Sequence, residues 1–484
     1  MNKKTFLKSL PFVLLAILVC AASLYLFEPP VGPALAGILG VITLLTPIIL
    51  KRPEFGLAMI GFFLPFERIP SMELGGMTLK INHFLVIFVF IVFLISALAQ
   101  KKLVIPKDPI RIFLLIFILS MTFSLGVAVD SSRSIQMIAL MLLMYILYFM
   151  ITLMISDKKI LILVLKGVMW GATVVAFLGV FQFLGDKAGL PTTITLLRPG
   201  YDKSTFGFAR VQALSQEPLY FANYIFLPLM LGLVLALRGK LQRIFSRRLG
   251  LVVLALLAIN FLIAISRGAY IGAAAVILVL LVTQAKLIFK AKTVAAIVLV
   301  LIIVFGGVYL ALAKSESRAL DEFIAHVAVQ DREEGESVVS RLNASTQALE
   351  LFRDEPLTGV GSGNFGPRVQ GDPDDTPEGG WFIVNNQYLE ILAENGIVGL
   401  LAFVVLITAI FARALFAIKK SKDALFKAVL IGLSLALVGI LVQYATFSTL
   451  YVFHIWFAVG LIGAVANLVL NRESGIVNCD VKKE

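Results

Sequence analysis

The sequence predicts an all-α, polytopic membrane protein with about 12–14 transmembrane helices and one large extracytoplasmic loop that contains short helices. Three observations lead to this prediction. Hydrophobic residues make up 59% of the 484-residue chain, and the charged residues, 15% of it, gather between long apolar runs. Only one hydrophilic stretch, residues 314–385, is large enough to fold outside a bilayer. We therefore expect a single integral membrane domain over residues 1–484, with residues 314–385 as a loop within it.

The apolar runs have the length of membrane-crossing helices. A helical run of about 17–25 apolar residues spans the hydrocarbon core of a bilayer. About fourteen such runs follow one another along the chain, and the third of them is short. They fall near residues 10–27, 31–50, 55–67, 81–99, 110–127, 134–155, 160–184, 219–237, 249–265, 269–285, 293–313, 396–415, 428–446 and 448–470.

Basic residues mark every second loop between these runs. Lys and Arg concentrate in the cytoplasmic loops of membrane proteins, so this alternation predicts an even number of spans with both termini in the cytoplasm. The same rule accounts for the net charge of +12 without nucleic-acid binding. Residues 185–218, the corner at 266–268 and the loop at 314–385 then lie outside. The basic loops are Lys51–Arg52, Lys101–Lys107, Lys158–Lys159, Arg238–Arg248, Lys286–Lys292, Lys419–Lys422 and Lys482–Lys483.

The large loop contains a predicted helix followed by a glycine-rich turn. In SRLNASTQALELFRDEPLTGVGSGNFGP, apolar residues recur at helical spacing, and the proline and glycines that follow stop a helix. We expect this helix to lie on the outer membrane surface or to cap the bundle of spans. Its apolar side comprises Leu342, Ala348, Leu349, Leu351 and Phe352, and the stop signals are Pro356, Gly359, Gly361 and Gly363.

Two arginines stand on the predicted outer side, where basic residues are the minority. Arg210 lies just before a span, and Arg267 lies at a corner between two spans. A guanidinium binds phosphate oxygens through two parallel hydrogen bonds, so two of them could hold a pyrophosphate. Each charged hydrogen bond would contribute about 1.5–3 kcal/mol. The alternative is that each arginine reaches to the membrane interface or pairs with an acid such as Glu217.

The motif NNQYLEILAENGIVG joins the large loop to the next span. Asn385 and Asn386 stand where a helix would begin, and asparagine is a good N-cap, so a capping role competes with a catalytic one. Tyr388 follows helical spacing, which is typical of packing. Glu394, followed by the glycines 396 and 399, could end an interfacial helix and admit a tight bend.

The predicted spans carry few charges near their centres. Ion-coupled transporters place acidic, basic or histidine residues at mid-membrane, so their scarcity counts against a proton-coupled pump. His454 lies within an apolar run beside Trp456. We interpret it as a hydrogen-bonded packing residue.

Four stretches, in this order, resemble a known family. They are FGFARVQALSQEPLYFA, the SRG corner, ALELFRDEPLTGVGSGNFGP and NNQYLEILAENGIVGLL, and they cover roughly residues 200–415. The chain resembles the O-antigen ligase and polymerase superfamily of bacterial glycan assembly. The resemblance implies a multi-span glycosyltransferase of the bacterial inner membrane that needs no cofactor, metal or nucleotide sugar. Its donor would be a glycan on undecaprenyl pyrophosphate at the outer leaflet, and its acceptor a lipid or another glycan.

The resemblance also implies roles for single residues. Arg210 and Arg267 match the arginines that grip the pyrophosphate, and Gln212, Tyr388 and Glu394 are further candidates for substrate binding. The partners implied are the lipid-linked donor, the acceptor and membrane lipid, with no nucleic acid.

The sequence departs from the ligases at one position. Ligases usually show His-Asn at the start of the last motif, and here that position is Asn385, which cannot take a proton at neutral pH. Either the base lies elsewhere, with Glu217 and Glu390 as candidates, or transfer relies on positioning and leaving-group stabilisation. The departure favours a repeat-unit polymerase or a more distant transferase over a lipid A-core ligase. The candidate catalytic residues are Arg210, Glu217, Arg267, Asn385, Asn386 and Glu390.

Two other functions remain open from the sequence. A transporter or flippase of envelope glycan precursors would also need many spans and outer arginines. It would move lipid-linked units without forming glycosidic bonds. In a structural role, the outer loop would instead be a docking platform for other assembly proteins.

Overall fold

The computed structural model describes residues 15, 17–25, 31–74, 77–99, 105–203, 208–288, 332–370 and 381–473. Within these residues the chain is almost entirely helical, and eight helices are long and apolar enough to cross a membrane. Three shorter apolar helices accompany them. The prediction of an all-α, polytopic membrane protein is confirmed.

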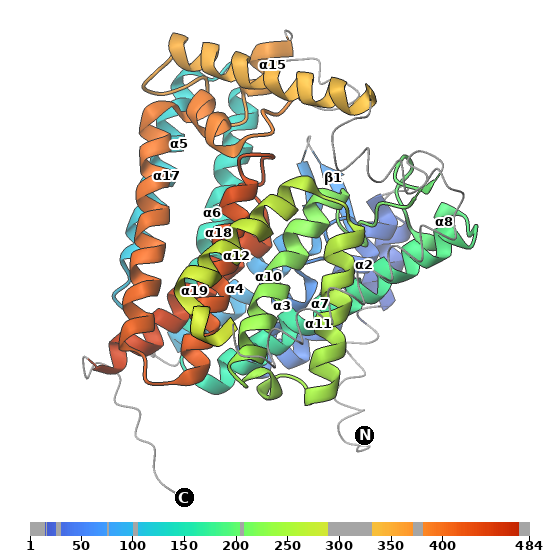
Figure 1. The fold of residues 1–484 in the computed structure, drawn as a ribbon, viewed down its shortest axis with the longest axis vertical. Coiled ribbons are helices and arrows are strands. Elements are labelled where there is room, and N and C mark those ends of the chain that lie inside the picture. The colour runs from blue at the N-terminus through green and yellow to red at the C-terminus, as the bar shows by residue number, and fades with distance from the viewer. Residues whose placement is uncertain are drawn as a thin grey trace, which may run out of the picture.

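The elements follow the predicted order (Figure 1). They are α2 (Val31–Lys51), α3 (Pro53–Phe63), β1 (Ser71–Leu74), β2 (Met77–Lys80), α4 (Ile81–Ala99), α5 (Pro109–Phe123), η1 (Ser124–Val127), α6 (Ser131–Met154), α7 (Lys158–Lys187), α8 (Thr192–Thr195), α10 (Pro218–Leu237), η2 (Leu241–Arg243), α11 (Arg247–Ile263), α12 (Arg267–Ile288), α15 (Arg332–Asp354), α16 (Phe365–Gln370), α17 (Gln387–Lys420), α18 (Ala424–Gln443) and α19 (Phe453–Glu473).

Most predicted spans coincide with helices in the part of the chain that the structure describes. The predicted span at 293–313 lies outside the described residues, and of 10–27 only residues 15 and 17–25 are described, as helix. The short third span is α3, whose 11 residues are too few to cross a bilayer alone. The sequence reading missed the antiparallel hairpin of β1 and β2.

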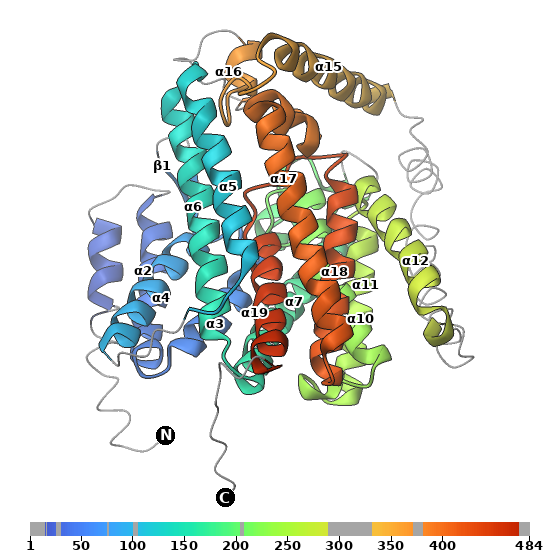
Figure 2. The same cartoon turned by 90° about the vertical axis from the view of Figure 1, so that its left-hand side faces the viewer.

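The long helices stand side by side, and α15 lies across one end of the bundle (Figures 1 and 2). We call this the α15 end; α6, α12 and α17 begin there. The opposite end holds the starts of α7, α11 and α18 and the last turn of α17. Its helix termini carry basic side chains, so we call it the basic end: Lys158 and Lys159 of α7, Arg247 and Arg248 of α11, and Lys419 and Lys420 of α17.

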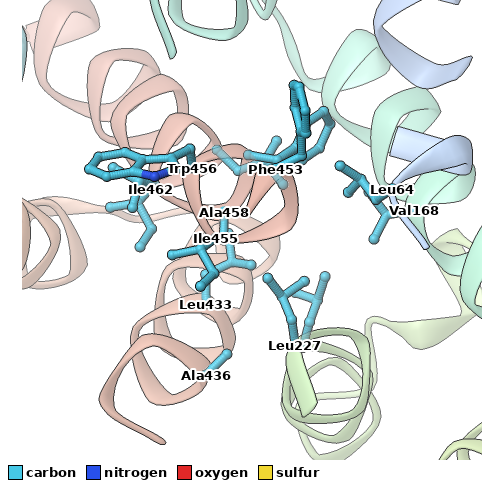
Figure 3. Packing of buried hydrophobic residues seen from close by; sticks show 14 of the residues in the cluster. Leu64, Val168, Leu227, Leu433, Ala436, Phe453, Ile455, Trp456, Ala458 and Ile462 are labelled. Carbon is cyan, nitrogen blue, oxygen red and sulfur yellow. The ribbon is translucent and has the colours of Figure 1, made fainter. Parts of the chain in front are cut away.

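The core of the bundle forms around α19, whose apolar stretch Phe453–Leu470 is almost completely buried. Figure 3 shows Phe453, Ile455 and Trp456 of α19 among Leu433 of α18 and Leu227 of α10. Between lipid-exposed helices there is little hydrophobic driving force, so such close packing is what holds the bundle together.

Aspartates start several of the helices. The side chains of Asp108, Asp130, Asp157 and Asp423 accept hydrogen bonds from backbone N–H groups in the first turns of α5, α6, α7 and α18. Each satisfies N–H groups that have no partner within the helix, and each places a negative charge at the positive end of the helix dipole. These residues therefore fix where four of the long helices begin.

A polar chain crosses the interior between α10, α18 and α19. The Asn223 amide donates to Gln443 Oε1 at 3.0 Å, and its Oδ1 lies 2.7 Å from His454 Nε2. All three side chains are fully buried. His454 is thus the hydrogen-bonded packing residue that the sequence predicts, and Asn223 links the three helices through it.

Replacing Asn223 by leucine is expected to destabilise the protein strongly. The substitution keeps the volume but leaves Gln443 and His454 without their buried partner, at a cost of about 1–3 kcal/mol for each group. Thermal unfolding of the purified protein in detergent measures the effect. Thr408→Ala is the control, because the Thr408 hydroxyl bonds only to the Val404 carbonyl of its own helix and is exposed. Equal unfolding temperatures of the two variants would contradict a role for the polar chain.

Candidate functional site

The segment that carries Arg210 is held from three sides at the α15 end. The Arg210 N–H donates to the Tyr201 carbonyl at 2.9 Å, and the Val211 N–H donates to the Ile263 carbonyl at 3.4 Å. The N–H groups of Glu67 and Arg68 both donate to the Leu214 carbonyl. These bonds tie the segment to the end of α11 and to the loop after α3.

Gln212 lies inside this support. Its side chain is fully buried, and the amide of Gln182 in α7 bonds the backbone of residues 212 and 213. The candidate substrate-binding residue Gln212 is therefore part of the packing that supports the segment, whereas Arg210 is partly exposed.

The Arg210 side chain bonds to the backbone just ahead of Arg267. Its Nη2 donates to the Ile265 carbonyl at 3.2 Å, and Arg267 is the first residue of α12, two positions later. Ile265 has φ +47°. A β-branched residue rarely adopts this conformation, which costs about 1–3 kcal/mol and is typical of functional sites. The strained turn directs the Ile265 carbonyl at Arg210 and places Arg267 beside it.

The two guanidinium groups share one electrostatic environment. The charge of Arg210 acts directly on Arg267. Burial lowers the pKa of Arg210, whereas Tyr201, Glu217 and Tyr270 raise it. The Arg210 Cζ atom also lies 6.0 Å from the centre of the Tyr201 ring, within cation–π range. Arginine keeps its proton in such surroundings, so the site has two adjacent positive charges.

Among the candidate carboxylates, Glu217 is the one that acts electrostatically on Arg210. It occupies the N-cap position of α10, but its side chain makes no capping hydrogen bond. It is half-buried and acts electrostatically on Arg210 and on Tyr220. A carboxylate in this position can accept a proton from a group bound against the arginines.

The start of α12 rests on the loop between α18 and α19, residues 444–452, which we call the 444–452 loop. A Cβ atom at Gly268 would collide with the Thr446 hydroxyl, and one at Gly272 would come 2.6 Å from the Gly439 carbonyl. These two glycines therefore permit close approach of α12 to its neighbours.

Gly268→Ala is expected to lower stability by about 1–3 kcal/mol, because the added methyl forces α12 away from Thr446. Combining it with Thr446→Ala removes the colliding hydroxyl and should recover part of the loss. A double-mutant cycle in thermal unfolding measures the coupling, expected to exceed about 0.5 kcal/mol. Strictly additive effects would show that the two residues do not touch.

The 444–452 loop also holds the start of α17. The Gln387 N–H donates to the Tyr444 carbonyl at 2.7 Å, and Gln387 Oε1 accepts from the N–H groups of Thr449 and Leu450. Ser448 donates to Glu390 Oε2 at 2.7 Å. The loop thus connects the helix that carries Arg267 to the helix of the last sequence motif.

Glu390 is enclosed by these contacts. Its Oε2 also accepts from the Val384 N–H at 3.2 Å, and the residue is only 9% exposed. Glu217 and Glu390 both act electrostatically on Tyr220, as Glu67 does. Of the two candidate bases, Glu217 is the one more open to a substrate.

The asparagines of the last motif divide their roles. Asn386 is the N-cap of α17 and accepts from the N–H groups of Tyr388 and Leu389. Asn385 is half-buried with φ +57°, a left-handed conformation that asparagine tolerates better than most residues. The Tyr388 hydroxyl donates to the Leu441 carbonyl at 2.6 Å, which directs it at α18.

Glu394 clamps the glycine-rich turn of the large loop. Its carboxylate accepts from the N–H groups of Gly363 and Phe365 at 2.7 and 3.2 Å, and its carbonyl accepts from the Gly361 N–H. Gly396, with φ +63°, bends α17 immediately afterwards. The predicted bend at this position is confirmed. Both carboxylate oxygens of Glu394 accept hydrogen bonds from the backbone of the glycine-rich turn.

The predicted loop helix is α15, and it caps the bundle. Ala348 and Leu351 are buried against Val360, Phe365, Val384 and Ala393. Leu342 and Leu349, which belong to the predicted apolar side, lie outside this buried contact and are 61% and 40% exposed. The polar turn at residues 371–380 lies outside the described residues.

Three residues near the arginine pair escaped the sequence reading. Tyr201 and Tyr270 interact with Arg210, and Arg341 of α15 interacts with both Arg210 and Arg267. Tyr270 follows Arg267 by three positions, the spacing of one helical turn, so it could have been found from the sequence.

A family model described as O-antigen ligase (Wzy_C) matches residues 251–404. This segment is similar to the O-antigen ligase family, and we call it the O-antigen ligase segment. It contains Arg267, α15 and the start of α17, and with them three of the four motifs that carry the resemblance. The resemblance to the O-antigen ligase and polymerase superfamily is thereby confirmed. No curated protein matches the chain. The family match indicates a membrane function in glycan assembly.

Arg210 and Glu217 precede the O-antigen ligase segment, and the 444–452 loop follows it. The geometry nevertheless joins all of them at the α15 end, through the bond from Arg210 to Ile265 and the packing of Gly268 on Thr446. The candidate site is therefore built by the segment together with the chain on both sides of it.

Proposed function

We propose that the protein is a membrane glycosyltransferase of the polymerase or ligase type, acting on a glycan linked to undecaprenyl pyrophosphate at the outer leaflet. The observation that carries the proposal is the pairing of Arg210 and Arg267 at the α15 end, within a chain whose segment 251–404 is similar to the O-antigen ligase family. Two adjacent guanidinium groups suit a lipid diphosphate, whose oxygens accept bidentate hydrogen bonds.

The charge distribution supports placing this site outside. The basic end carries the Lys and Arg residues of α7, α11 and α17, and such residues concentrate on the cytoplasmic face. The α15 end then faces the periplasmic side of the bacterial inner membrane, where lipid-linked glycans are presented. The same assignment puts both termini in the cytoplasm.

The proposed reaction is a displacement at the anomeric carbon of the donor glycan. A hydroxyl oxygen of the acceptor forms the new glycosidic bond, and the bond from the anomeric carbon to the diphosphate oxygen breaks. The diphosphate leaves with the electron pair, and Arg210 and Arg267 stabilise it. Glu217 takes the hydroxyl proton, because it lies beside the arginines and is partly open, whereas Glu390 bonds to Val384 and Ser448.

The other candidates receive supporting roles in this proposal. Asn386 caps α17, Glu394 holds the glycine-rich turn, and Gln212 fills the support beneath Arg210. Asn385 precedes the N-cap residue Asn386 in the sequence, and Tyr388 follows it in the first turn of α17. None of these side chains is assigned a proton transfer.

Purified protein in liposomes, given an undecaprenyl-pyrophosphate oligosaccharide and a glycan acceptor, tests the proposal. Longer glycans and released undecaprenyl pyrophosphate are expected. Movement of the lipid-linked oligosaccharide between leaflets without any new glycosidic bond would instead support the transporter. If the protein neither lengthens glycans nor moves the lipid-linked oligosaccharide, whichever acceptor is supplied, the proposed function is wrong.

A further inference from the structure

Leu196 and Ala213 hold their backbones in a conformation that residues with a side chain rarely adopt. Their φ angles are +59° and +46°. Within the described residues only four that are not glycine have a positive φ, and the other two are Ile265 and Asn385 of the candidate site. Such residues persist only where their surroundings fix the conformation, and they gather at functional sites. What holds Leu196 and Ala213 therefore bears on the site.

Two side chains, Arg68 and Gln182, hold both residues, and we call this pair the clamp. The Leu196 carbonyl accepts from Arg68 Nη2 and from Gln182 Nε2. The Ala213 carbonyl accepts from the same two atoms, at 3.2 Å from each. The N–H groups of residues 212 and 213 in turn donate to Gln182 Oε1 at 3.3 and 2.8 Å. The clamp thus ties two stretches of the loop 185–218 to each other and to α7.

The Arg68 guanidinium is engaged with the protein at both of its terminal nitrogens. Nη2 bonds to the two clamped carbonyls. Nη1 lies 3.3 Å from the Gln212 side-chain oxygen, in the amide orientation that satisfies both ends of that side chain. The backbone N–H of Arg68 donates to the Leu214 carbonyl at 2.9 Å. Arg68 therefore holds the segment that follows Arg210 through its side chain and its backbone alike.

The clamped segment carries two groups of the proposed reaction. Arg210 stands three positions before Ala213, and Glu217 stands four positions after it. The turn at the other clamped residue carries Arg198, whose Nη1 donates to the Gln216 carbonyl at 3.2 Å, directly before Glu217. The two left-handed turns thus determine how the chain presents Arg210 on one side and Glu217 on the other.

We infer that Arg68 is a positioning residue for glycan transfer: its clamp on the two left-handed residues fixes how Arg210 and Glu217 lie relative to each other. This inference rests on the proposed function. The group that stabilises the leaving diphosphate and the group that takes the proton must act on one bound substrate, and a misplacement of about 1 Å can cost about a hundredfold in rate. Without Arg68 the strained turns relax, while the bundle of spans stays folded.

Arg68→Ala tests the inference, with Arg68→Lys and Arg52→Ala as matched variants. Arg52 precedes α3 as Arg68 follows it, and it is exposed and makes no capping hydrogen bond. Arg68→Ala should lower kcat by about tenfold to a hundredfold at a nearly unchanged KM for the donor. Its unfolding temperature should change little, because the strain released offsets the bonds lost. Arg68→Lys should keep part of kcat, since an ammonium can still bond to the clamped carbonyls, and Arg52→Ala should keep all of it.

Ala213→Gly distinguishes holding the chain from binding the substrate. Glycine adopts a positive φ without strain, so this turn then depends less on the clamp. Added to Arg68→Ala, it should restore a large part of the lost kcat, although it brings no positive charge. Hydrogen exchange of residues 211–217, measured by mass spectrometry, should be faster in Arg68→Ala than in the wild type and should slow again in the double variant.

Transfer by Arg68→Ala at the rate of Arg52→Ala would overturn the inference and leave the proposed function standing. A loss that appears in KM, or that Ala213→Gly does not recover, would assign Arg68 to substrate binding and would overturn it as well. If Arg68→Ala does not insert into the membrane, Arg68→Lys decides by the same two criteria. A wild type that forms no glycan product refutes the proposed function, and the inference with it.

Discussion

Alanine at Arg210 or at Arg267 is expected to reduce glycan transfer by about a hundredfold or more. Each substitution removes charged hydrogen bonds to the departing diphosphate, and such bonds contribute about 1.5–3 kcal/mol each. Because Arg210 also bonds the Ile265 carbonyl, its loss should loosen the turn that places Arg267. The double variant should therefore be less impaired than the product of the two single effects predicts. Transfer by purified protein in liposomes, at saturating donor, measures all three.

Arg368→Ala serves as the control for these variants. Arg368 belongs to α16, is exposed, and lies at the same end of the molecule. It should leave transfer unchanged, since no contact links it to the arginine pair. The amount of membrane-inserted protein and its elution on size exclusion should be the same for every variant. Full transfer by both Arg210→Ala and Arg267→Ala would remove the basis for the diphosphate site.

Gly396→Ala is expected to cause the largest loss of stability among single substitutions at the α15 end. Alanine would have to adopt φ +63°, and its Cβ would collide with the Leu357 carbonyl and come 2.7 Å from the Thr358 nitrogen. Strain and overpacking each cost about 1–3 kcal/mol, so a total of about 2–6 kcal/mol is expected. The bend of α17 and the turn that Glu394 holds should be lost together.

Thermal unfolding in detergent, together with limited proteolysis of the large loop, measures this effect. Gly126→Ala is the matched control, because no atom lies within 4 Å of its added Cβ. Gly126→Ala should unfold like the wild type, and Gly396→Ala should unfold at a clearly lower temperature with faster cleavage in the loop. A Gly396→Ala variant as stable as Gly126→Ala would show that α17 can straighten at no cost.

The helices could be predicted from the sequence because length and apolarity alone decide which segments cross a bilayer. The α3 helix shows the limit of this reasoning. Its segment is apolar, yet the helix ends after 11 residues, and the chain then turns toward the hairpin of β1 and β2. The exposure of Leu342 shows a second limit, since helical spacing defines a face but not how far along the helix a neighbour covers it.

The sequence singled out Arg210 and Arg267 as candidates because both stand beside spans on the predicted outer side, but the way Arg210 is held could not be predicted. The bond from Arg210 to the Ile265 carbonyl depends on a left-handed backbone conformation at Ile265. Such a conformation is usually indicated by glycine or asparagine, and neither stands at this position. Glu394 was a candidate for substrate binding because it lies in the last motif. Its contacts with Gly363 and Phe365 arise from the folding of the large loop back onto α17, a long-range arrangement that local pattern does not encode.

The 444–452 loop restricts how this protein can be recombined with its relatives. It supports Arg267 through Thr446 and the start of α17 through Gln387, yet it lies beyond the matched segment, as Arg210 lies ahead of it. A chimera that exchanges residues 251–404 alone would combine Arg267 and the start of α17 from a relative with Arg210 and the 444–452 loop of this protein, which need not fit them. Functional grafts should therefore begin before Arg210 and extend through α19.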